Sequence, residues 1–157
     1  MTDTVVTSEY FMLHSDRLHF HQVTLNGKYS FQYISDSIFE DCEFNTKDAF
    51  WHAKKCLSLK NSIVKGEYLA WYSENVTFEN CTIIGTQPFC YCKNLTLINC
   101  KMLDADLAFE KLEVTAGITT PVISIKNPLS GVITVSDLGE LIMDDATAKG
   151  KVIICNQ

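Results

Sequence analysis

The sequence predicts an all-β fold of the solenoid class, a parallel β-helix with three short strands in each coil. The first observation is a repeat: the segment at residues 75–84 (NVTFENCTII) returns at residues 94–103 as NLTLINCKML. The second is a column of polar residues whose spacing along the chain is 19 or 20. A near-constant period of this length is typical of stacked repeats. The column consists of Gln22, Asp41, Asn61, Asn80 and Asn99.

Inside the repeat, apolar residues alternate with polar ones, which is the period of a strand rather than of a helix. Val76 and Phe78 share one side before Asn80, and Cys81 and Ile83 share one side after it. Because the apolar set stays in phase across Asn80, we expect this polar residue at a corner between two strands. Its amide can then form a ladder with the equivalent residues above and below, which makes its role structural.

A third segment of each coil follows the second strand. It reads YSFQYI at residues 29–34, DAFWHA at 48–53, EYLAWYS at 67–73 and QPFCYCK at 87–93. The coil leaves no room for a helix, so we expect this segment to form a third short strand. One coil cannot bury its own apolar face, and therefore each coil needs its neighbours above and below.

We expect a single β-helix domain at residues 1–157, without a linker. The register is regular to about residue 111, and residues 112–157 form atypical coils, as is usual at the end of a repeat stack. The first coil lacks its first strand, which leaves an open edge. Three explanations stay open: the chain is a segment of a longer β-helix, it forms a homo-oligomer through this edge, or Asp16 and Arg17 blunt the edge.

Composition and charge exclude several classes of function. The net charge is −6 and Arg17 is the single arginine, so no basic stripe for nucleic acid is expected. No apolar run approaches the roughly 20 residues of a membrane span, and the first residues lack a signal-peptide pattern. Three of the seven cysteines, Cys42, Cys81 and Cys100, share one inward position. This pattern predicts reduced thiols and a cytoplasmic location.

No metal site and no cofactor are predicted. Cys90 and Cys92 form a CxC pair, but no second pair or histidine cluster lies at the spacing of zinc ligands. His19 and His21 face outward on one strand without a third ligand, so we interpret them as solvated side chains.

Most of the chain resembles a known family. Residues 31–54, residues 60–100 (KNSIVKGEYLAWYSENVTFENCTIIGTQPFCYCKNLTLINC), DLAFE at 106–110 and KNPLSG at 126–131 are similar to the C-terminal half of an uncharacterised bacterial family, domain of unknown function 3737. The resemblance implies a right-handed, pectate-lyase-like (pectin lyase-like) β-helix. Family members carry further coils before this region, which favours a segment of a longer solenoid. The resemblance implies no activity and no catalytic residues.

The third segment carries the candidate binding residues. If it is a strand, its side with Leu69, Trp51 and Trp71 is the more uniformly apolar one, and we place that side inward. The other side then faces outward with three columns. These are Tyr10, Tyr29, Asp48, Tyr68, Gln87 and Asp106; Met12, Phe31, Phe50, Ala70, Phe89 and Ala108; and His14, Tyr33, His52, Tyr72, Tyr91 and Glu110.

An outward stripe of aromatic rings edged by acids and histidines is typical of a carbohydrate-binding groove, because ring faces stack on sugars and polar groups bond their hydroxyls. The predicted function is therefore a non-enzymatic carbohydrate-binding or interaction scaffold. Two alternatives stay open: the stripe only stabilises the fold, or the face is inverted. The predicted ligand-binding residues are Tyr29, Tyr33, Asp48, His52, Tyr68, Tyr72, Phe89, Tyr91, Asp106 and Glu110.

Two further functions are alternatives, a self-assembling module and a carbohydrate-active enzyme. For the enzyme, His52, Tyr72 and Asp48 are the candidate catalytic residues. A Tyr–His pair could remove a proton from a uronate, but no outward arginine is present to neutralise the uronate carboxylate. Asp48 and Asp106 lie three rungs apart, roughly 14 Å, which exceeds the roughly 5–10 Å between paired glycosidase carboxylates. No constellation is convincing as an active site.

Overall fold

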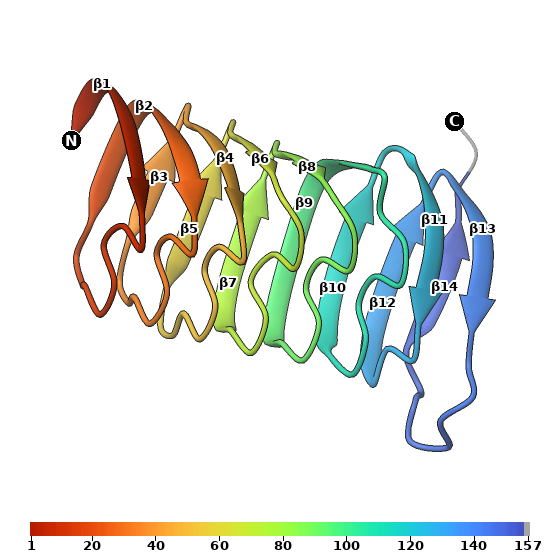
Figure 1. The fold of residues 1–157 in the computed structure, drawn as a ribbon. Helices are drawn as coiled ribbons and strands as arrows, with labels where there is room; N and C mark the ends of the chain where they lie inside the picture. Colours follow the sequence, from red (N-terminus) through yellow and green to blue (C-terminus); the bar gives the residue numbers. More distant parts are fainter. Residues whose placement is uncertain (156–157) are drawn as a thin grey trace.

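The structure is a computed structural model that describes residues 1–155. Its parallel strands stack into a solenoid of about eight turns, with the first strand and the last strand at opposite ends of the stack (Figure 1). The described part contains fourteen strands and no helix, and hence no helix that could cross a membrane. The prediction of an all-β parallel solenoid with coils of about 19 residues is confirmed.

The fourteen strands form the straight sides of the coils, and corners separate most of them. In chain order they are β1 (Thr2–Glu9), β2 (His19–Lys28), β3 (Ile38–Glu40), β4 (Glu43–Lys47), β5 (Leu57–Lys60), β6 (Ile63–Lys65), β7 (Glu74–Glu79), β8 (Thr82–Ile84), β9 (Lys93–Leu103), β10 (Glu113–Ile118), β11 (Pro121–Lys126), β12 (Ser130–Val135), β13 (Asp137–Ile142) and β14 (Lys151–Ile154).

Two columns of parallel strands meet in one sheet. The first strands of successive coils form the order β14-β12-β10-β9-β7-β5-β3-β2, and the second strands continue it as β4-β6-β8. β2 and β9 are long enough to belong to both columns, because β9 also pairs with β8. β1 pairs with β2 and with no other described strand. Whether another chain pairs with the free edge of β1 stays a prediction.

The polar column lies at the corner between the two strand columns, as predicted. Pairing of Glu40 with Lys60, and of Lys60 with Glu79, places the following residues, Asp41, Asn61 and Asn80, one above another. Each has a positive φ of 50–53°, a conformation that Asn and Asp adopt more readily than most residues. Asn99 continues the column, and its Nδ2 donates to Oδ1 of Asn80 at 2.7 Å.

The third segment of the early coils is not a strand, and the prediction is wrong there. Residues 48–52 form consecutive turns, in which Asp48, Phe50 and His52 have φ of 54–60°. The amide of Asp48 donates to Glu67 O of the following coil (2.9 Å), whereas Phe50 donates to Ser30 O of the preceding coil (3.0 Å). These bonds to both neighbouring coils offset the roughly 1–3 kcal/mol that each left-handed residue costs.

This backbone sends the middle residue of each turn inward. Phe31, Phe50, Ala70 and Phe89 are 0% exposed, although the strand pattern places them outward. Phe50 stacks on Phe31 with ring centroids 5.0 Å apart. The predicted outward orientation is therefore wrong for this column, and Phe89 cannot contact a ligand at the surface. The two flanking columns do lie outside, since left-handed residues do not follow the strict alternation of a strand.

A one-residue slip follows in the next coil. Tyr91 donates its amide to Glu110 O (2.7 Å), so Lys111 and not Glu110 follows Tyr91 in its column. Phe109 donates to Pro88 O (3.2 Å) and stacks on Phe89 (5.9 Å), so Phe109 takes the inward place predicted for Ala108. By the same shift, Leu107 and not Asp106 follows Gln87 in its column, because the Gln87 amide donates to Asp106 O. The predicted column positions of Asp106, Ala108 and Glu110 are therefore wrong by one residue.

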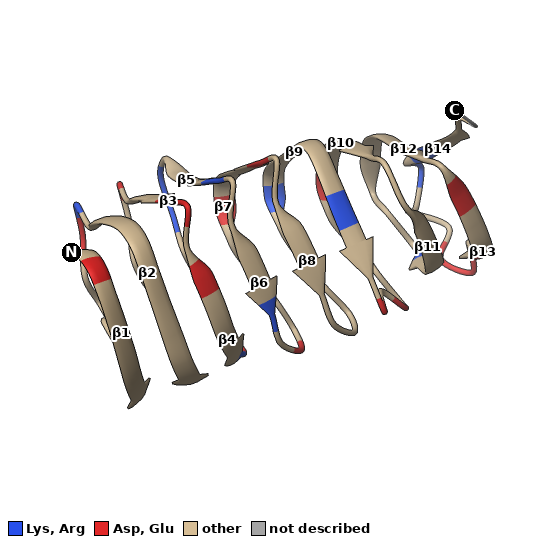
Figure 2. Cartoon of the chain, turned by 90° about the horizontal axis from the view of Figure 1, so that it is seen from above, with Lys and Arg blue, Asp and Glu red and all other residues tan. Residues whose placement is uncertain are grey.

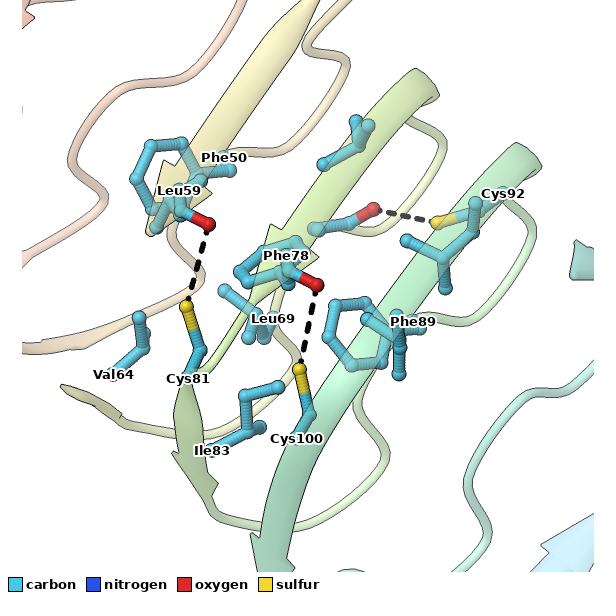
Figure 3. Close-up of a cluster of buried hydrophobic side chains, with 14 of the residues drawn as sticks. Phe50, Leu59, Val64, Leu69, Phe78, Cys81, Ile83, Phe89, Cys92 and Cys100 are labelled. Atoms are coloured by element: carbon cyan, nitrogen blue, oxygen red, sulfur yellow. Dashed lines mark hydrogen bonds between the residues drawn. The ribbon is translucent and has the colours of Figure 1, made fainter. Parts of the chain in front are cut away.

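The core runs along the axis and contains buried thiols. Cys81 and Cys100 lie beside Phe78 and Ile83, and their Sγ atoms donate to Leu59 O and Phe78 O of the preceding coil, each at 3.4 Å (Figure 3). Burial raises the pKa of Cys81 to about 12, so this thiol stays protonated. All seven cysteines are free.

The last coils change shape. The register of β9 with β10 shifts between Ala116 and Ile118, and β11 and β13 pair as a separate two-stranded sheet. An isolated bridge joins Ile125 of β11 to Ala108, which places β11 beside the side that turns occupy in the earlier coils. Buried Asn127 fastens the loop after β13, because its Nδ2 donates to Asp144 Oδ1 at 2.7 Å.

Candidate functional site

An aromatic ladder follows the outer side of the turns. We use this name for His14, Tyr33, His52, Tyr72 and Tyr91, one ring from each of five successive coils. Successive ring centroids are 4.7, 4.8, 5.1 and 4.9 Å apart, with interplanar angles of 6–11°. The rings are therefore stacked face to face along the solenoid axis, at the rung spacing of the sheet.

Stacking covers the ring faces that a sugar would need. Each inner ring of the ladder has a neighbour on both faces, so a ligand can meet only the ring edges. Those edges are accessible, since Tyr33 is 49% and Tyr72 is 45% exposed. The groups at these edges that can hydrogen-bond a ligand are phenol hydroxyls and imidazole nitrogens, and successive groups lie one rung apart. This differs from the predicted groove, in which ring faces stack on pyranose rings.

The second outer column is less regular. Tyr10 and Tyr29 stack with centroids 5.0 Å apart and an angle of 28°. The Nζ atoms of Lys28 and Lys47 each lie 5.6 Å from the centroid of the Tyr29 ring, within reach of a cation–π interaction. Asp48 then takes the place of a ring, so the stack ends there.

Asp48 has an unusual environment. Its Oδ1 atom is buried and has no hydrogen-bond partner among the described residues. Burial raises the pKa of this carboxyl group, and Glu67 adds to the effect, while Lys47 opposes it. A buried oxygen without a donor destabilises the ionised form. The protonated form is therefore favoured over a wider pH range than for an ordinary aspartate.

Two stacked tryptophans lie beside the ladder, and one of them, Trp71, contacts it. Trp51 and Trp71 are half-buried, and their rings stack at 5.3 Å and 5°. Their indole N–H groups donate to Tyr68 O (2.6 Å) and Gln87 O (2.7 Å). Trp71 also contacts Tyr91 edge-on at 5.6 Å. The Tyr72 and Tyr91 rings therefore pack against Trp71 as well as against each other.

The candidate catalytic residues are not assembled into a proton-transfer chain. The rings of His52 and Tyr72 lie parallel (5.1 Å, 6°), whereas a hydrogen bond between a phenol and an imidazole nitrogen needs edge-to-edge contact. None of the side-chain hydrogen bonds within residues 1–155 joins Asp48 to His52. His52 and Tyr72 are therefore stacked and do not form a hydrogen-bonded relay.

The structure separates the other predicted site residues. Seven of them remain on the turn side of the solenoid, with side chains that are at least partly exposed. They are Tyr29, Tyr33, Asp48, His52, Tyr68, Tyr72 and Tyr91. Phe89 is in the core. Asp106 accepts the hydroxyl of Thr86, and Glu110 lies 3.5 Å from Lys126 Nζ with little exposure. These two carboxylates are therefore engaged with protein groups.

A groove on the first-strand face was not predicted from the sequence. It has a volume of about 730 Å³ and lies over β3, β5, β7 and β9. Its floor is a column of small side chains, Ser58, Thr77 and Thr96, aligned by the strand register. The available signal was the recurrence of Ser or Thr at one outward strand position, between positions with longer side chains.

Charge is spread without a stripe of one sign. Figure 2 shows Lys and Arg interspersed with Asp and Glu along the coil. Several side chains are paired across coils: Lys60 forms an ion pair with Glu79 at 3.8 Å, and His19 Nε2 lies within hydrogen-bonding distance of Glu40 Oε2 at 3.2 Å. Within residues 1–155, no group of three or more His, Cys, Asp or Glu side chains is placed to hold a metal ion.

Comparison with known proteins gives one match. A family model described as "Protein of unknown function (DUF3737)" matches residues 1–155. The match spans the chain, so it does not support the expectation that the chain is only the C-terminal half of a family member, nor does it indicate a bacterial source. No curated protein and no solved structure matches the chain.

Proposed function

The chain belongs to the DUF3737 family of proteins of unknown function, and we propose that it is a non-enzymatic scaffold that binds carbohydrate along its turn side. The observation that carries the proposal is the aromatic ladder, whose polar edges face solvent at intervals of 4.7–5.1 Å. A glycan presents hydroxyl groups at regular intervals, and regularly spaced donors and acceptors suit such a ligand. Stacking, together with the contacts of Trp71 with Tyr72 and Tyr91, fixes the ring edges in advance, which lowers the entropy cost of binding.

The charge of the site favours a neutral glycan over a polyuronate. Among the groups on this side, Asp48 and Glu67 are acidic, and Lys28 and Lys47 lie over the Tyr29 ring. Lys28 is further engaged by Glu9 at 3.2 Å. A uronate carboxylate would therefore find no free cation cluster on the ladder. The same shortage argues against polysaccharide lyase chemistry, which needs a positive group beside the carboxylate.

The double variant Tyr33→Phe/Tyr72→Phe tests the proposal. It removes two exposed hydroxyls but keeps both rings in the stack, so we expect the same melting temperature and a weaker glycan complex. Loss of one or two hydrogen bonds should raise the Kd about three- to thirtyfold. Binding of cellohexaose, xylohexaose and hexagalacturonate is measured by calorimetry for both proteins.

Two results would contradict the proposal. One is an unchanged Kd in the double variant, which would mean that the ladder edges make no contact. The other is no measurable binding of any of the three oligosaccharides to the unmodified protein. Tyr72→Ala serves as the control for a purely structural role, since it removes a ring from the stack and should lower the melting temperature, unlike Tyr72→Phe.

A further inference from the structure

The shape of the groove on the first-strand face comes from side-chain size. Its floor consists of Ser58, Thr77 and Thr96, which lie on adjacent rungs of β5, β7 and β9. Two residues further along the strands, Lys60 and Glu79 form one wall. The other wall lies two residues before the floor, at Asn75 and Asn94 near the starts of β7 and β9. A column of small residues between two columns of longer ones leaves a channel along the solenoid axis.

The floor offers free hydrogen-bonding groups at rung spacing. The hydroxyls of Ser58, Thr77 and Thr96 take part in no side-chain hydrogen bond within the described residues. By contrast, the inward hydroxyls of Ser62 and Ser73 donate to Lys60 O (2.8 Å) and Phe50 O (2.6 Å). The floor hydroxyls therefore remain available as donors and acceptors, about 4.8 Å apart, and the threonine methyl groups add apolar contact between them.

The charges of the wall residues determine which ligands the groove can accept. Asn94 donates through Nδ2 to Asn75 Oδ1 at 2.7 Å, which leaves the Asn75 amide N–H groups and the Asn94 carbonyl oxygen free for a ligand. Lys60 and Glu79 lie 3.8 Å apart and offset each other, and Asp36 is the further charge in the lining. The groove therefore carries no excess positive charge and disfavours a polyanion.

We propose that this groove is a carbohydrate subsite that takes a neutral oligosaccharide chain lying along the solenoid axis, across β5, β7 and β9. The class of ligand rests on the proposed function, whereas the place and the direction of the chain rest on the groove itself. Sugar hydroxyls bond the Ser and Thr column and the Asn wall. The C–H faces of the sugars lie on the threonine methyl groups and on Ile38, which is 45% exposed at one end of the lining.

Two natural thiols allow a direct footprint of this site. Cys56 lines the groove, and Cys155 lies away from it beside Asn99 and Thr119; both are exposed, while the other five thiols are buried. Alkylation by iodoacetamide is followed for each thiol by mass spectrometry, with and without saturating cellohexaose or xylohexaose. We expect a neutral oligosaccharide to slow alkylation of Cys56 several-fold and to leave Cys155 unchanged. Hexagalacturonate should protect neither thiol.

A matched pair of isosteric variants adds an affinity readout. Thr77→Val removes the central floor hydroxyl and keeps the side-chain shape, so we expect a three- to tenfold higher Kd. Thr82→Val makes the same change in β8, outside the groove, and should leave the Kd unchanged. Equal Kd values for the two variants, or equal alkylation of Cys56 with and without each neutral oligosaccharide, would overturn the groove proposal.

These experiments can contradict the ladder proposal and the groove proposal independently of each other. Protection of Cys56 together with an unchanged Kd in Tyr33→Phe/Tyr72→Phe would remove the ladder and support the groove. A weakened double variant with unprotected Cys56 would do the reverse. Absence of binding by all of the oligosaccharides would remove both.

Discussion

Replacing Phe50 with alanine should lower the free energy of unfolding by about 3–5 kcal/mol, the range for a large side chain lost from a packed core. The Phe50 ring is fully buried and lies 5.0 Å from Phe31, 5.3 Å from Phe39 and 5.9 Å from Phe44, measured between centroids. Its removal opens a cavity between adjacent coils, which cannot close without moving their backbones. Denaturant unfolding followed by circular dichroism measures the change.

His52→Ala is the matched control for this prediction. His52 lies two residues further along the same turn and has the same left-handed backbone, but its ring is outside, stacked between Tyr33 and Tyr72. Losing that stack should cost about 1 kcal/mol. If Phe50→Ala cost no more than His52→Ala, the middle column of the turns would not point inward, and the description of the turn segment would be wrong.

Gly131→Ala should lower the free energy of unfolding by about 2–5 kcal/mol, through backbone strain and a steric clash. Gly131 lies in β12 opposite Val114 of β10 and has a φ of +94°. A Cβ atom at this position would lie 1.8 Å from Val114 O and 2.8 Å from Val114 C. Because the clash is with backbone, relief requires β10 and β12 to separate.

Gly117→Ala is its control within the same pair of strands. A Cβ at Gly117 would meet its nearest atoms, Leu97 O and Asn99 N, at 3.8 and 3.9 Å, which is ordinary contact. We expect the stability to change by less than about 1 kcal/mol, since alanine also reduces the entropy of the unfolded chain. Melting temperatures of both variants provide the measurement, and equal losses would contradict the close approach of β12 to β10.

The strand columns could be predicted because their pattern is local. Val76 and Phe78 alternate with polar residues, as extended backbone requires, and Asn80 can adopt the left-handed corner at small cost. The same pattern recurs in the neighbouring coil at Leu95 and Leu97. Register then follows from the repeat, because a shift of one residue would expose every buried side chain.

The backbone of the turn side could not be predicted, because several of its residues adopt φ values that are rare for their residue types. Phe50 and Tyr72 have positive φ, a conformation that is common for Gly and enriched for Asn, Asp and His but not for Phe or Tyr. Bonds to the coils above and below enforce this backbone, and such bonds are not visible in a local pattern. The slip at Phe109 was missed for another reason, the variable length of the coil: Phe89 and Phe109 are 20 residues apart, whereas Ala70 and Phe89 are 19 apart.

The candidate sites differ in how far they were predictable. The aromatic columns were recognisable from residue type, so Tyr33 and Tyr72 were placed at the surface correctly. That both rings stack on the His52 ring between them could be seen only once the height of each ring along the axis was known. The groove depends on the relative lengths of Thr77, Lys60 and Asn75 in adjacent coils, and these lengths form a channel only once the strands are in register.

Disulfide cross-linking at the corner column tests most directly that each coil lies one rung above the last. Asn80→Cys/Asn99→Cys places two thiols on adjacent rungs, about 4.8 Å apart at Cα, within the range that a disulfide spans. Asn61→Cys/Asn99→Cys places them two rungs apart, beyond that range. Both pairs are made with Cys56 and Cys155 replaced by serine, and mild oxidation is followed by mass spectrometry. A disulfide in the first pair and none in the second is the predicted result; the opposite pattern, or no disulfide in either pair, would contradict the stacked coil.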